Sequence, residues 1–253
     1  TLSVGVLANY NSALNEGIHF YPGIDASYRI GDNFRLYGSW NRALRMPTFT
    51  DLYYEGKTNK GNPDLKPEES EAFEVGLKYN TYFLRAHIAG FYRKGKNMID
   101  WVKEKPEDIW ESQNLTKVDN LGFETNLSLL PRELGNERFF IRKIELGYAF
   151  IHQDKDSEGY ISNYALDYLK HKFTAQLSHS IWKGFSATWY VRWQDRAGSY
   201  TKYENLKPAY EEPYAPYCLV DMKVNWEYQR LNLYAELNNL LNSTYYDLGN
   251  IPQ

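Results

Sequence analysis

The sequence predicts an all-β fold, and within that class a transmembrane antiparallel up-and-down β-barrel. Runs of about ten residues alternate apolar and polar side chains, which places the two sets on opposite faces of a strand. Phe34, Leu36 and Trp40, for example, alternate with polar residues. Short turns join the runs at one end and long polar loops at the other, which is typical of outer-membrane barrels. Aromatic residues make up 17% of the chain, with 23 Tyr and 7 Trp, and these side chains suit a membrane–water boundary.

The alternation predicts about eleven strands. Each one should present its apolar series to lipid and its polar series to a lumen. They are expected at 1–10 (Leu2, Val4, Val6, Ala8), 21–30 (Ile24, Ala26, Tyr28, Ile30), 34–41 (Phe34, Leu36, Gly38, Trp40), 69–79 (Phe73, Val75, Leu77), 82–93, 120–130 (Phe123, Thr125, Leu127, Leu129), 140–152, 171–181 (Phe173, Ala175, Leu177, Ile181), 185–194 (Phe185, Ala187, Trp189, Val191, Trp193), 217–227 and 231–238.

Two classes of connection separate these strands. Gly31, Asp32 and Asn33 form a tight turn of residues that tolerate positive φ angles. By the barrel rule the short turns are periplasmic and the long loops extracellular. Within the loop at 94–119, segment 98–102 is expected to extend a strand beyond the membrane. The short turns are 31–33, 80–81, 131–138, 182–184 and 228–230, and the long connections are 11–20, 42–67, 94–119, 153–169, 195–216 and 239–253.

Composition narrows the classes of protein that remain. A mean hydropathy of -0.64 with 24% charged residues fits a barrel, because half of its strand residues face a wet lumen. The net charge of -3 is too small to indicate nucleic acid as a partner. No stretch reaches the roughly 18 apolar residues of a membrane-spanning helix. A soluble β-sandwich is the structural alternative, but it rarely combines long up-and-down strands with a long loop at every second connection.

The ends of the chain and its cysteine carry further expectations. Cys218 is the single cysteine, so it forms no intramolecular disulfide, and nothing around it resembles an activated thiol. An odd strand count leaves a barrel without its closing partner, whereas single-chain bacterial barrels have an even count. We therefore expect a piece of a longer protein that lacks its last strand and an N-terminal part. No signal peptide is recognisable at Thr1.

Four motifs in succession resemble segments of TonB-dependent outer-membrane receptors. The first is the run 37–53, YGSWNRALRMPTFTDLY. The second, GNPDLKPEES at 61–70 followed by FEVGL at 73–77, is similar to the family's N-P-x-L-K-P-E stretch and E-x-G strand. NLGFE at 120–124 matches N-x-G-x-E, and 238–246 resembles the N-N-L-x-N-x-x-Y segment before the last strand.

The resemblance implies a barrel of about 22 strands plugged by an N-terminal domain. Residues 1–253 would be the C-terminal half of that barrel, without the plug and the last strand. The family imports scarce, bulky ligands such as cobalamin or another corrinoid, or a ferric siderophore. The motifs around Pro47 and Pro67 most resemble the cobalamin-receptor branch. The implied partners are outer-membrane lipid, the protein's own plug, TonB of the energised inner-membrane complex, the ligand and a surface lipoprotein of a Gram-negative cell; no cofactor is implied.

Charged residues at every second position are expected to face the lumen. One interpretation is a network of ion pairs that fills the wall and contacts the plug. The alternative is a charged translocation path. The residues are Arg29, Arg35, Glu74, Lys78, Arg85, Glu124, Lys172, Arg192 and Glu236.

Aromatic residues in the long loops are the candidate ligand contacts. Flat amphipathic rings suit a large planar or macrocyclic ligand. The alternative is that these rings form the outer aromatic belt or pack loop against loop. The candidates are Tyr53, Tyr54, Trp101, Trp110, Tyr160, Tyr164, Tyr200, Tyr203, Tyr210 and Tyr214.

One acidic run offers hard oxygen ligands. Asp154, Asp156 and Glu158 could hold calcium in an extracellular loop, although a solvated acidic loop is the simpler interpretation. The five histidines show no paired metal spacing, and no nucleophile–base arrangement indicates catalysis. A passive porin-like barrel, or an outer-membrane enzyme or adhesin, remains the functional alternative to a receptor.

Overall fold

The computed structural model describes residues 1–10, 17–105, 107–135, 138–156, 159–162, 168–204 and 207–246. Across these ranges, thirteen strands form one large sheet and two more form a separate hairpin. The elements are β1 (Leu2–Tyr10), β2 (Ile18–Ile30), β3 (Phe34–Arg45), α1 (Phe49–Tyr53), β4 (Asn59–Lys60), β5 (Glu68–Asn80), β6 (Leu84–Lys103), β7 (Trp110–Leu129), η1 (Pro131–Leu134), β8 (Ile141–Asp156), β9 (Ile161–Ser162), β10 (Leu169–Trp182), β11 (Phe185–Arg196), β12 (Ser199–Glu204), β13 (Lys207–Pro213), β14 (Tyr217–Tyr228) and β15 (Leu231–Leu237).

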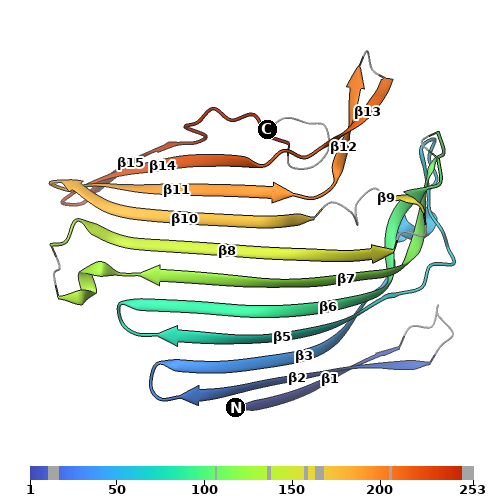
Figure 1. Cartoon of the computed structure of the whole chain (residues 1–253), viewed down its shortest axis with the longest axis horizontal. Helices are drawn as coiled ribbons and strands as arrows, with labels where there is room; N and C mark the ends of the chain where they lie inside the picture. The colour runs from blue at the N-terminus through green and yellow to red at the C-terminus, as the bar shows by residue number, and fades with distance from the viewer. Residues whose placement is uncertain are drawn as a thin grey trace.

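The predicted series of up-and-down strands is confirmed. In the part of the chain that the structure describes, eleven strands follow the order β1-β2-β3-β5-β6-β7-β8-β10-β11-β14-β15, as Figure 1 shows. Every neighbouring pair on this path is antiparallel. The two short additions are β4, which pairs with β7 in parallel, and β9, which pairs with β6.

The short turns gather at one end of the sheet and the long connections at the other, on the left and right of Figure 1. Left-handed backbone conformations close the turns at Gly31 (φ 62°), Gly184 (φ 86°) and Gln229 (φ 52°). The turn at 131–138 contains the 3-10 helix η1, which ends at Gly135 with a left-handed φ of 102°. This asymmetry is the arrangement that the sequence predicted.

Three long connections contain more regular structure than the sequence predicted. β6 and β7 are each 20 residues long, so most of 94–119 continues their hairpin. The expected extension at 98–102 is thereby confirmed. The register of this hairpin is the same on both sides of Asn97, where the backbone has a positive φ of 54°. The loop at 42–67 contains α1 and β4, and the loop at 195–216 contains the β12–β13 hairpin. Alternation does not reveal such segments, because beyond a membrane both faces of a strand can be polar.

The large sheet has two chemically distinct faces. We call the face that carries Phe34, Trp40 and Phe73 the apolar face, and the one that carries Arg35 and Tyr37 the polar face. Large hydrophobic side chains remain exposed on the apolar face, including Val75 with 60% and Phe73 with 45% of their surface. Among the described residues, no helix is both long enough and apolar enough to cross a membrane.

Aromatic rows border the apolar face near both ends. At the long-loop end, ring contacts at 4.9–6.2 Å between centroids link Phe123, Phe150, His171 and Trp193 across four strands. At the turn end, Trp226 stacks with both Phe185 and Tyr228 at 5.9 Å. Beyond the first row the sheet pairs opposite charges in register, Glu71 with Lys94 and Lys94 with Asp119. The apolar face thus consists of an apolar band between two aromatic rows, with charged residues beyond the row at the long-loop end. This is the outer surface expected of a membrane barrel.

Candidate functional site

The polar face is the first candidate site, because it brings the predicted luminal charges together. Strand register places all nine of these described residues on that face. Four of the side chains on this face lie opposite one another on successive strands: Arg29, Arg35, Lys78 and His87. Arg85 lies two residues from His87 on β6, closer to the turn end of the sheet. Their assignment to a lumen and to plug contact stays a prediction.

A hydrogen-bonded network crosses β3, β5, β6 and β7 on this face. The Tyr37 hydroxyl donates to Glu74 Oε1 at 2.7 Å and lies 2.7 Å from His87 Nε2. Because a hydroxyl has one proton, the His87 Nε2–H must donate to Tyr37 in this arrangement. His87 Nδ1 then faces Glu124 Oε1 at 3.8 Å. The network therefore links two carboxylates through one phenol and one imidazole.

The glycines of two family-like motifs make this packing possible. Tyr37 lies directly opposite Gly76, and a Cβ on Gly76 would come within 2.5 Å of the Tyr37 ring. Phe91 lies opposite Gly122 in the same way, where a Cβ would come within 2.5 Å of its ring and 2.4 Å of the Phe150 carbonyl oxygen. Each glycine thus leaves space for an aromatic side chain of the neighbouring strand, beside the glutamate of its motif.

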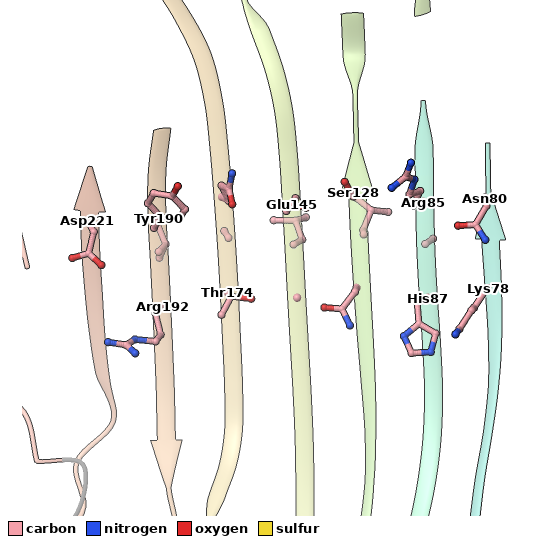
Figure 2. A pocket seen from close by; sticks show the side chains of 18 residues that line it. Lys78, Asn80, Arg85, His87, Ser128, Glu145, Thr174, Tyr190, Arg192 and Asp221 are labelled. Atoms are coloured by element: carbon pink, nitrogen blue, oxygen red, sulfur yellow. The ribbon is translucent and has the colours of Figure 1, made fainter. Parts of the chain in front are cut away.

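A concavity of about 610 Å³ lies on the polar face, toward the turn end. Figure 2 shows its side chains, which come from β5 at one side to β14 at the other. Cations and carboxylates both contribute, among them Arg85, Glu145, Arg192 and Asp221. A mixed-charge surface of this kind can bind polar groups of another molecule or of another segment of the same protein.

Sequence analysis missed His87 as a member of this site. Its side chain contacts Tyr37 and faces Glu124, and it lies opposite Lys78 in the register. The sequence did contain a signal for it: His87 lies two residues from Arg85 on an alternating strand, so the two side chains share the polar face. Metal spacing, the criterion applied to the histidines, does not detect such a network.

The second candidate site is the loop end of the sheet, where the N-P-x-L-K-P-E segment is held in place. Arg45 donates to both carboxylate oxygens of Glu68, at 2.6 and 2.5 Å. Glu68 is 7% exposed and also accepts the Ile99 N–H at 2.8 Å. Arg45 lies 3.7 Å from Asp51, which forms a capping box with Thr48 at the start of α1. One arginine and one buried glutamate therefore join the first loop to β3, β5 and β6.

Two of the aromatic candidates near this loop come together. Tyr54 and Trp101 meet edge to face at 6.3 Å. Tyr53 and Tyr54 keep 58% and 50% of their surface exposed. Trp110 lies under the Lys103 ammonium at 4.5 Å, and Tyr160 lines a cavity of about 280 Å³ together with residues of β6 and β7.

The candidates of the β12–β13 region form a second group. Tyr200 and Tyr214 are each 6% exposed and pack together at 5.3 Å, while Tyr200 also stacks on Tyr246 at 4.7 Å. Little of either ring is left for a ligand in this structure. Tyr210 is 50% exposed beside Lys202. Tyr203 lies in β12, and Tyr164 lies outside the described residues.

The calcium candidate is only partly described. Asp154 lies opposite Asp119 and Asp156 opposite Lys117, whereas Glu158 lies outside the described residues. Lys117 Nζ is 3.2 Å from Asp119 and 3.8 Å from Asp154. An ammonium group therefore already lies between these two carboxylates. No group of three or more potential metal ligands occurs among the residues that the structure describes, and calcium stays a prediction.

Comparison with protein families assigns the fold. The model of the TonB-dependent receptor-like β-barrel matches residues 5–240. This chain belongs to the TonB-dependent receptor family, as the four motifs predicted, and it supplies part of the family's β-barrel.

Individual relatives differ in the ligand that their names give. The vitamin B12 transporter BtuB of Vibrio vulnificus is 27% identical over 178 residues, which cover 56% of this chain and 28% of the relative. The ferripyoverdine receptor of Pseudomonas aeruginosa is 24% identical over 252 residues, 93% of this chain and 28% of the relative. The chain thus spans about a quarter of the length of these relatives.

A solved structure shows the same fold. A mutant of the ferric enterobactin receptor PfeA of Pseudomonas aeruginosa, in complex with enterobactin, superposes with a TM-score of 0.72 at 19% identity. The superposition covers 96% of this chain and 38% of the receptor.

Proposed function

We propose that this chain is the C-terminal part of the barrel of an outer-membrane receptor that imports a scarce, bulky ligand. The family match over residues 5–240 carries the proposal. It is supported by the apolar band between aromatic rows on one face and the charged network on the other. In this arrangement the apolar face contacts lipid, and the polar face lines a lumen occupied by the receptor's plug.

The proposed ligand is a corrinoid such as cobalamin, or a ferric siderophore. Relatives named as a vitamin B12 transporter and as a ferripyoverdine receptor support both classes. Tyr53, Tyr54 and Trp101, at the loop end, would offer the first aromatic surface to a ligand from outside the cell. Energy would come from TonB, which acts on the plug rather than on these residues.

Equilibrium binding to the complete receptor tests this proposal. Cyanocobalamin and a panel of ferric siderophores are titrated in detergent, and one class is expected to bind with a Kd in the roughly nanomolar range of a scavenging receptor, which corresponds to about -12 kcal/mol. Uptake by cells should then require TonB. A receptor that binds neither class, or uptake that continues unchanged without TonB, would contradict active import and favour a passive barrel.

A further inference from the structure

The side chain of Asn114, in the part of β7 near the long-loop end, joins three segments of the chain at one point. Its Oδ1 accepts the N–H of Lys66 at 2.9 Å, and its Nδ2 donates to the carbonyl oxygen of Lys66 at 3.0 Å. The same Nδ2 donates to the carbonyl oxygen of Asn97 at 2.7 Å. Lys66 belongs to the first loop, 42–67, and Asn97 to β6. One amide therefore connects the first loop with both strands of the β6–β7 hairpin.

A short primary amide is well suited to this connection. Its side chain carries an acceptor oxygen and two N–H donors in one plane, so it can pair with a backbone N–H and C=O as a neighbouring strand would. Both donors of Asn114 are used within the protein, one for Lys66 and one for Asn97. An aspartate would keep the acceptor but lose the donors, and a leucine of similar size would lose both.

A second connection lies directly across the hairpin from the first. Ile99 is opposite Asn114 in the register of β6 and β7, and its N–H donates to the buried carboxylate of Glu68 at 2.8 Å. Pro67, between Lys66 and Glu68, has a φ angle fixed by its ring. Two facing residues of the hairpin thus hold the two loop positions on either side of a rigid one.

Farther along the hairpin, the first loop also contributes to an aromatic surface. β4 pairs in parallel with the start of β7, where Trp110 donates its N–H to the carbonyl oxygen of Thr58 at 2.9 Å. This pairing is only two residues long, which is short for a strand and gives little stability by itself. The edge-to-face pair at 6.3 Å takes Tyr54 from the loop and Trp101 from the hairpin. The shape of this surface therefore depends on how the loop lies against the hairpin.

We propose that Asn114 is a positioning residue for ligand binding, which holds the first loop on the β6–β7 hairpin before the ligand arrives. The inference rests on the proposed function, in which Tyr54 and Trp101 offer the first aromatic surface. A loop that is already ordered spares binding the entropy cost of ordering it. Loss of the amide lowers the fraction of receptor molecules in the binding-competent state, and the apparent affinity falls by the same factor.

Stopped-flow binding to the complete receptor in detergent separates positioning from direct contact. The probes are cyanocobalamin and ferric enterobactin, and the parent is compared with Asn114→Leu. For the probe that the parent binds, the association rate constant should fall about tenfold in the variant, because fewer molecules are competent, while the dissociation rate constant stays within about twofold. Loss of a direct contact would raise the dissociation rate constant instead.

The matched control is Asn120→Leu. Asn120 lies on the same strand, and its side chain bonds the amide of Gln153 rather than the first loop. Both rate constants should equal those of the parent. If Asn114→Leu does not fold, Asn114→Asp replaces it, because this side chain has the same size and keeps the acceptor for Lys66, and the same change in association is expected.

A reversible covalent link supplies a result that a merely stabilising role would not give. In a Cys218→Ala background, Lys60→Cys and Glu111→Cys place two thiols on paired residues of β4 and β7. Neighbouring strands lie about 4.8 Å apart, which suits a disulfide. In the Asn114→Leu receptor the oxidised link should restore most of the association rate constant, and reduction should abolish the gain without changing the parent.

Three results would overturn the inference: unchanged rate constants in Asn114→Leu, a change in dissociation alone, or no recovery of association with the oxidised link. A parent receptor that binds neither probe refutes the proposed function and the inference with it. A parent that binds one probe, with no slower association in Asn114→Leu, refutes the positioning role alone.

Discussion

The glycines of the polar face show how a single hydrogen in place of a side chain determines local packing. Gly122→Ala would push a methyl group to 2.4 Å from the backbone carbonyl oxygen of Phe150. Backbone in the middle of a sheet cannot move aside, so we expect a loss of about 2–3 kcal/mol, as for overpacked cores. For Gly76→Ala the three atoms nearest to the added methyl group all belong to the Tyr37 side chain, which can move, so the substitution should cost about 1 kcal/mol.

Urea unfolding of the detergent-solubilised receptor measures both effects. Gly90→Ala is the matched control, because it lies in β6 and the nearest atom to an added Cβ is 3.9 Å away. Its stability should remain within about 0.5 kcal/mol of the parent. Equal losses for Gly122→Ala and Gly90→Ala would show that the close approach to Phe150 does not matter.

A second residue-scale prediction concerns pH. In the β12–β13 hairpin, Lys202 Nζ donates to Glu212 Oε2 at 2.6 Å, and this hydrogen bond lowers the pKa of the Glu212 carboxyl. Because the pKa of Glu212 is lower in the folded protein than in the unfolded chain, the ion pair stabilises the hairpin at pH values above the ordinary glutamate pKa of about 4.3. That contribution is lost as the pH falls through the lowered value.

Carbon-13 NMR of the Glu212 carboxyl reads this titration directly. The midpoint should lie below the ordinary value in the parent protein and move up toward it in Lys202→Met. Lys183→Met, at the opposite end of the sheet, should leave the midpoint unchanged. An unaltered midpoint in Lys202→Met would rule out the ion pair as the cause.

At the scale of elements, the first loop depends on the contact between Arg45 and Glu68. Arg45→Ala would leave a carboxylate that is 7% exposed without its cation. Because Arg45 itself is about half exposed, the expected cost is about 1–2 kcal/mol, between the values of surface and buried pairs. The loss should concentrate in α1 and the segment that follows it.

Amide hydrogen exchange localises this effect. The N–H groups of Leu52, Gly61 and Asn62 donate to carbonyl oxygens within the loop, and their exchange should accelerate about tenfold or more, equivalent to about 1.4 kcal/mol. Arg42→Ala is the matched control, because Arg42 pairs with Glu69 and Glu71, which are both more than a third exposed. Comparable acceleration in the control would contradict a special role for Arg45.

The elements also show how far sequence reasoning extends. The path strands were predictable because hydrophobic alternation is a local signal, strong wherever one face contacts lipid. The outer halves of β6 and β7 were harder to recognise, since polar residues such as Lys94 and Lys96 occupy the face that is apolar nearer the turns. Tyr37 and Glu74 could be assigned to one face, but that they touch depends on the register between β3 and β5. The same register brings His87 into the network.

At the scale of the whole molecule, the asymmetry of the connections predicts an orientation in the membrane. In a Cys218→Ala background, Lys57→Cys in the first long loop should react with a membrane-impermeant maleimide in intact cells. Asp32→Cys, in the turn between β2 and β3, should react only after the outer membrane is permeabilised. The reverse pattern would invert the assignment of long loops to the cell exterior.

By itself the sequence determined the class of fold, the two faces, the gathering of the short turns at one end of the sheet, and the family. These follow from period-two alternation, turn residues and motifs, all of which are local in the chain. Tertiary structure alone decided which residues meet: Tyr37 over Gly76, Arg45 on Glu68, and Arg29, Arg35 and Lys78 in one row. It also buried Tyr200 and Tyr214 among other tyrosines. These contacts join segments that are far apart in the chain. The free energy of each contact depends on both segments, so it cannot be inferred from the sequence of either segment alone.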